Sequence, residues 1–112
     1  MEKYLYDGED FKAVLTTTNW KIGLLRFSER FSKPCVLERH LKTDEAFVLL
    51  NGSADLYIKN ADETLEITHM EKDIVYNIPK GEWHHIVVSR DALVMVVENS
   101  DTSKENTERV TV

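Results

Sequence analysis

The sequence predicts an antiparallel all-β protein folded as a single domain. Short segments rich in β-branched and aromatic residues recur along the chain at fairly even spacing, and turn-forming residues separate them. No window of a dozen residues shows convincing 3.6-residue periodicity, so we expect little helix. Closure of the strands into a barrel or a two-sheet jelly roll would remove exposed strand edges. At this stage a sandwich without an internal site is the alternative.

The expected strands follow one another from the first third of the chain onwards. In order they are residues 20–27, 46–50, 54–58, 64–68, 73–78, 85–89 and 93–98. Segments such as Asn51-Gly52-Ser53 and Pro79-Lys80-Gly81 lie between them and suit tight turns. Residues 8–15 suit either a short helix or a first strand. The polar tail, residues 99–112, ends in Val110-Thr111-Val112 and is either frayed or an extra edge strand.

Size and charge restrict the classes of partner. A chain of 112 residues has the length of one domain with one core, so we expect residues 1–112 to form a single unit. The net charge of −6 repels nucleic acids and anionic membranes. No apolar stretch approaches the roughly 20 residues of a membrane-spanning helix, and the first residues do not resemble a secretory signal. We therefore expect a cytoplasmic protein with a small-molecule or metal partner.

Cys35 is the only cysteine, which excludes an internal disulfide and a thiolate cluster. Any bound metal must be held by nitrogen and oxygen atoms. Glu38 and His40 are two residues apart, so on a strand they point to the same face. Glu45 precedes the apolar run 46–50 and would lie at the mouth of an apolar interior.

A second polar group follows Pro79, where a turn leads into the apolar segment 86–88. It contains the adjacent residues His84 and His85. Because neighbouring side chains on a strand point to opposite faces, we expect one imidazole to point inward and the other outward. Periodicity alone does not decide which.

The first of these segments, about residues 37–52, resembles the first sequence motif of the cupin superfamily. That motif has two histidines separated by one residue, then three or four residues, a glutamate, six residues and a glycine. His40, Glu45 and Gly52 match this spacing. Glu38 departs from it, because it replaces the first histidine.

The second segment, about residues 73–88, resembles the second cupin motif. Pro79, Gly81 and His84 match its proline, glycine and histidine. Asp73 replaces the opening glycine, and Val88 replaces the asparagine usually found four residues after the histidine. The resemblance implies a cupin-type double-stranded β-helix, or jelly-roll barrel.

The resemblance also implies one divalent metal held by His40, Glu45 and His84. Two imidazoles and one carboxylate suit Fe(II) and also accept Mn, Co, Ni or Zn. Glu38 would be a fourth ligand, a general base beside the metal, or a structural partner of a cation such as Arg26. A fourth, carboxylate ligand would favour Mn or Fe. The alternative for these residues together is a site that holds no metal and is either empty or filled by water.

Other candidates have weaker support. Phe47 shares a strand face with Glu45 and would line a substrate pocket, Tyr76 would offer a hydroxyl, and Arg26 would hold an anionic substrate. We interpret His69 and His85 as hydrogen-bonded core or surface groups rather than ligands.

Two functions remain open. One is a metal-dependent enzyme, of isomerase or oxygenase type, that acts on a small oxygen-rich metabolite. The other is a non-catalytic cupin that binds or senses a small ligand. Under either function, the resemblance implies a homodimer, and exchange of the tail segment between subunits is one way to form it.

Overall fold

The computed structural model describes residues 1–112 and contains ten strands and two short 3₁₀ helices. In chain order these are β1 (Phe11–Thr16), β2 (Trp20–Arg26), η1 (Glu29–Phe31), β3 (Val36–His40), β4 (Glu45–Asn51), β5 (Ala54–Lys59), β6 (Leu65–His69), β7 (Val75–Ile78), β8 (His84–Val88), β9 (Leu93–Asn99), η2 (Lys104–Asn106) and β10 (Thr107–Thr111). The all-β prediction is confirmed.

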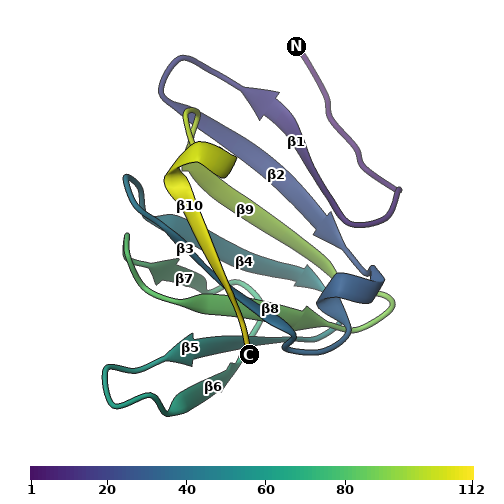
Figure 1. Cartoon of the computed structure of the whole chain (residues 1–112). Coiled ribbons are helices and arrows are strands. Elements are labelled where there is room, and N and C mark those ends of the chain that lie inside the picture. Colours follow the sequence, from purple (N-terminus) through teal and green to yellow (C-terminus); the bar gives the residue numbers. More distant parts are fainter.

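The strands form two five-stranded sheets in which every pairing between named strands is antiparallel (Figure 1). One sheet has the order β1-β2-β9-β4-β7, and the other has the order β10-β3-β8-β5-β6. From β3 onwards the chain passes repeatedly between the sheets, so strands distant in sequence become neighbours. This crossing brings β3, β4 and β8, which carry the two motifs, to one region of the fold.

All seven strands predicted from the sequence are present, and their ends differ from the prediction by no more than two residues. Of the two readings of residues 8–15, the strand is the observed one, as β1. Of the two readings of the tail, the edge strand is observed: β10 pairs with β3 in a register that joins Thr107 to His40. The tail therefore forms one wall of the fold.

The core lies between the two sheets and follows the alternation expected of strands with one buried face. On β9, Val94 and Val96 are 0% and 2% exposed, and on β4 Phe47 and Leu49 are 3% and 2% exposed. Leu56 of β5 packs into the same cluster from the other sheet. The buried row of β4 begins at Glu45 and that of β9 ends at Glu98, so each apolar row leads into a carboxylate.

The turn between β4 and β5 depends on Gly52. Its φ of +73° lies in the left-handed region, which a residue with a side chain rarely adopts. A Cβ atom here would also lie 2.7 Å from the Cα atom of Ala92. Both constraints explain the glycine that follows Glu45 after six residues.

None of the helical segments is long and apolar enough to cross a membrane.

Candidate metal centre

His40, Glu45 and His84 converge in the interior, with one potential ligand atom from each residue lying within 4.8 Å of the others. Glu45 lies between the two imidazoles. Its Oε1 atom is 3.0 Å from Nε2 of His84, and its Oε2 atom is 3.2 Å from Nε2 of His40. All three residues are buried, at 8%, 8% and 4% exposure respectively. The structure thus forms a compact donor set of two nitrogens and a carboxylate.

The outer nitrogen of each imidazole has its own partner. Nδ1 of His84 is 3.0 Å from the carbonyl oxygen of Glu82, and because a carbonyl only accepts, this nitrogen carries a hydrogen. Nδ1 of His40 is 2.9 Å from the hydroxyl of Thr107 on β10. Partners of this kind orient metal-binding imidazoles in proteins. They aim both Nε2 atoms at Glu45.

Burial by itself would raise the pKa of Glu45, but hydrogen bonds from His40 and His84 outweigh it and lower that pKa. Burial would lower the pKa of His84, but the Glu45 carboxylate outweighs it and raises that pKa. Glu45 is thus held as a carboxylate, and both imidazoles face its oxygen atoms. Metals displace protons from such donors, so the residues fit a divalent transition metal.

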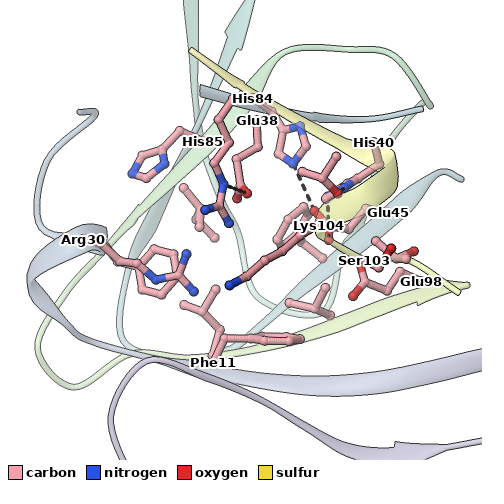
Figure 2. A pocket seen from close by; sticks show the side chains of 18 of the residues that line it. Phe11, Arg30, Glu38, His40, Glu45, His84, His85, Glu98, Ser103 and Lys104 are labelled. Carbon is pink, nitrogen blue, oxygen red and sulfur yellow. Dashed lines mark hydrogen bonds and ion pairs between the residues drawn. The ribbon is translucent and has the colours of Figure 1, made fainter. Parts of the chain in front are cut away.

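A cavity of about 340 Å³ opens beside the donor set (Figure 2). Its apolar wall consists of Phe11, Leu25, Phe31, Phe47, Ile86 and Val96. Exposed residues of the tail, including Ser103, Lys104 and Arg109, line the side that reaches the surface. The cavity has the size of a small-metabolite site and is accessible from solvent.

Glu98 also lines the cavity and was missed by the sequence analysis. It is 8% exposed, and the β4–β9 register pairs it with Glu45. Burial, then its hydrogen bond to Glu45, raise the pKa of Glu98 to about 9, although Lys21 opposes the shift. Its Oε2 atom is buried and has no hydrogen-bond partner. A protonated Glu98 can donate to Glu45. The alternation Val94, Val96, Glu98 within the predicted strand is the signal that would have revealed it.

Glu38 does not belong to the converging donor set. It lines the cavity and accepts a hydrogen bond from Nε of Arg109 on β10 at 2.8 Å. Pairing of Glu38 with a cation was one of the three expected roles, with Arg26 as the example; the observed partner is Arg109.

The three other candidates lie in different environments. Phe47 lines the cavity, and its ring meets that of His84 edge-on at a centroid distance of 6.1 Å. Tyr76 and Arg26 do not line the cavity. The hydroxyl of Tyr76 accepts from the backbone N–H of Glu71 at 2.9 Å, and Nε of Arg26 donates to the backbone oxygen of Tyr6 at 2.7 Å.

Both of the adjacent histidines are buried, and His85 is a core group rather than a ligand. His85 is buried as fully as the metal-site residues, at 8% exposure, because η1 packs against β8 and places Phe31 beside it. Burial lowers the pKa of His85. His69 is an exposed surface group whose Nδ1 lies 2.7 Å from a carboxylate oxygen of Asp55. Neither histidine belongs to the donor set.

Comparison with known proteins gives no match to a family model, and no curated protein sequence matches. Solved structures do match. A single-residue mutant of Bacillus subtilis oxalate decarboxylase OxdC superposes with a TM-score of 0.65 and 21% identity over 84% of this chain, which spans 25% of that enzyme's chain. The same enzyme has been studied for its Mn(II) centres.

Two further structures match over most of their own length. A cupin-2 domain protein from Shewanella frigidimarina has a TM-score of 0.64 and 15% identity, with 84% of each chain covered. A variant of Streptomyces PAC13 with uridine has a TM-score of 0.71 and 8% identity over 97% of this chain and 83% of that chain. The chain therefore has the cupin fold, as the motifs predicted.

Proposed function

We propose that this chain is a metal-dependent cupin enzyme that acts on a small, oxygen-rich metabolite. One observation carries the proposal: two imidazoles and a carboxylate converge at a solvent-accessible cavity. The Nδ1 atoms of the two imidazoles are held by the Glu82 carbonyl and the Thr107 hydroxyl. His40, Glu45 and His84 would hold the metal. When bound, such a metal supplies a Lewis acid with open positions for substrate oxygens.

The cavity favours catalysis over simple binding. A non-catalytic cupin needs only the donor set and a complementary wall, whereas here a second buried carboxyl group, Glu98, lies against Glu45 in the same cavity. A carboxyl group so placed can hold or move a proton at a bound substrate. Phe47 and its apolar neighbours would keep bulk water from that part of the cavity.

The metal itself is not specified by the donor set. Two imidazoles with one carboxylate suit Fe(II) and also Mn, Zn or Ni. The Mn(II) centres of oxalate decarboxylase support testing Mn first, although this chain spans only 25% of an oxalate decarboxylase chain. Fe(II) with oxygen dependence would indicate an oxygenase. Mn or Zn without oxygen dependence would indicate isomerase or lyase chemistry.

The test is turnover by metal-loaded protein. Protein loaded with Mn(II) or Fe(II) is incubated in D₂O with a panel of small hydroxy acids, keto acids, dicarboxylic acids and sugars, under air and under argon. We expect NMR to show conversion or deuterium exchange of at least one compound, absent with His84→Ala and strongly reduced with Glu98→Gln. If Glu98→Gln loses conversion and exchange but keeps its metal, the role of Glu98 is in catalysis and not in metal binding.

The alternative function is a non-catalytic binding cupin. It becomes the better account if the loaded protein binds compounds of the panel but converts and exchanges none. Binding without catalysis is also the better account if the parent and Glu98→Gln both convert a compound no faster than free metal does.

We further propose that the chain forms a homodimer. Its support is the exposed apolar surface of the edge strands: Ile67 of β6 and Val75 of β7 are 57% and 67% exposed. Light scattering on the purified protein tests this, and a monomer at all concentrations would contradict it.

A further inference from the structure

Four cationic side chains line the cavity beside the candidate metal centre: Lys21, Arg30, Lys104 and Arg109. Three of them already contact carboxyl groups of the protein. The pairs are Arg30 with Asp10 at 2.6 Å, Arg109 with Glu38 at 2.8 Å, and Lys21 with Glu98 at 3.7 Å. The fourth, Lys104, forms no ion pair. It is the one lining cation without a carboxyl partner in the protein; Lys21, beside the protonated Glu98, is instead engaged by the backbone oxygen of Thr102 at 2.8 Å.

Lys104 lies where a ligand in the cavity can reach it. Figure 2 shows its side chain extending from the tail into the cavity, between the side of the metal-site residues and that of Arg30. An unpaired ammonium group directed into a cavity, rather than along the surface, is a ready partner for an anionic ligand.

The backbone around Lys104 is firmly placed. The side chain of Asn106, which is 8% exposed, accepts from the N–H of Ser103 at 2.9 Å and donates to the carbonyl of Asp101 at 2.8 Å. The carbonyl of Asn106 accepts from the N–H of Leu41, next to the metal-site residue His40, at 2.9 Å. The tail segment that carries Lys104 is therefore tied to the strand that carries a candidate ligand.

We propose that Lys104 binds the anionic end of the substrate and that the substrate class is small carboxylates with a second oxygen donor, such as dicarboxylates and hydroxy or keto acids. This inference rests on the proposed function. A divalent cation beside the Glu45 carboxylate leaves one net positive charge at the metal, and Lys104 adds a second. A ligand with one oxygen group at the metal and a carboxylate at Lys104 matches both positive groups. A neutral sugar would leave Lys104 unpaired.

The test is anion binding to Mn(II)-loaded protein, measured by calorimetry with oxalate, malonate, succinate and glutarate, and with the diamide of each as a neutral control. Metal content is determined on every sample first. The variants are Lys104→Gln, Lys104→Arg and, as a control for net charge, Lys72→Gln, whose exposed side chain lies outside the cavity.

We expect at least one dicarboxylate to bind the parent more tightly than its diamide. Loss of one charged contact weakens binding by about tenfold or more, so Lys104→Gln should show that loss at unchanged Mn content. Lys104→Arg should retain most of the affinity, and Lys72→Gln all of it.

Two results would overturn the inference, and they differ from failure of the proposed function. If Lys104→Gln and the parent bind dicarboxylates equally well at full Mn content, Lys104 does not contact the ligand, and the metal centre still stands. If the diamides bind as well as the dicarboxylates, the proposed class of carboxylate substrates is wrong. Absence of Mn uptake by the parent contradicts the proposed function itself, and the inference falls with it.

Discussion

Glu45 and Glu98 face each other on neighbouring strands, as paired residues of the β4–β9 register. Two carboxylates in contact in an apolar setting do not both ionise near neutral pH. The two imidazoles lower the pKa of Glu45, whereas burial and the Glu45 charge raise the pKa of Glu98 to about 9. Glu45 is therefore the charged member, suited to a metal, and Glu98 is the protonated one.

The protonated state of Glu98 beside a charged Glu45 predicts how the stability of the metal-free protein depends on pH. The unfolded chain releases the Glu98 proton near the ordinary pKa of 4.5, whereas the folded protein keeps it until about pH 9. Because the folded state binds the extra proton, the free energy of unfolding should fall as pH rises between these values. His84, whose pKa is raised above 6.5, contributes in the same direction from that pH upwards. Urea denaturation in the presence of EDTA at a series of pH values measures the slope.

The Glu98→Gln variant is the matched control, since glutamine has the shape of a protonated glutamic acid and does not titrate. We expect its stability to decline less steeply between about pH 5 and 9, with the His84 contribution remaining. An identical slope in the variant and the parent would show that Glu98 titrates normally in the folded protein.

Thr107 should influence metal affinity without contacting the metal. Thr107→Val keeps the shape of the side chain but removes the hydroxyl that meets Nδ1 of His40 at 2.9 Å. Loss of such an outer partner typically lowers metal affinity about 10- to 100-fold. Titration with Mn(II) or Zn(II) should show this loss, whereas Thr111→Val, at the exposed end of β10, should bind as the parent does. Equal affinities in all three proteins would mean that the hydrogen bond does not orient His40.

The core between the sheets should respond strongly to truncation. Leu56 is 2% exposed, and Leu56→Ala should lower the free energy of unfolding by about 2 to 5 kcal/mol, through lost burial and a residual cavity. Leu65→Ala makes the same change at a residue that is 41% exposed on an edge strand, so its cost should be much smaller. Urea denaturation of the two variants gives the comparison, and similar losses would contradict the assigned core.

The donor set was predictable because His40, Glu45 and His84 match the cupin motifs; strand alternation alone does not choose between His84 and His85. In the structure His40 ends β3, Glu45 begins β4 and His84 begins β8, and their convergence is what the resemblance implies. Glu98 follows the same alternation from Val94 and Val96, but a single glutamate at the end of a strand has no motif to mark it.

The tail residues were not predictable in this way. Arg109 reaches Glu38 across 71 positions of sequence, and Lys104 reaches the cavity, only because β10 pairs with β3. Burial of His85 likewise depends on η1 packing against β8, a tertiary contact that the strand pattern does not contain. Local periodicity thus anticipates elements and their faces, whereas the partners of the cavity charges arise from long-range pairing.

The most direct test of the account is the metal content of untagged protein, determined by elemental analysis for the parent, His84→Ala, Glu38→Ala and His69→Ala. The account predicts close to one equivalent of a divalent transition metal per chain in the parent and its loss in His84→Ala. Glu38→Ala should retain the metal because Glu38 pairs with Arg109, and His69→Ala should retain it because His69 is an exposed residue outside the donor set. A parent protein that contains no metal and takes up none from added Fe(II), Mn(II), Ni(II) or Zn(II) would contradict it.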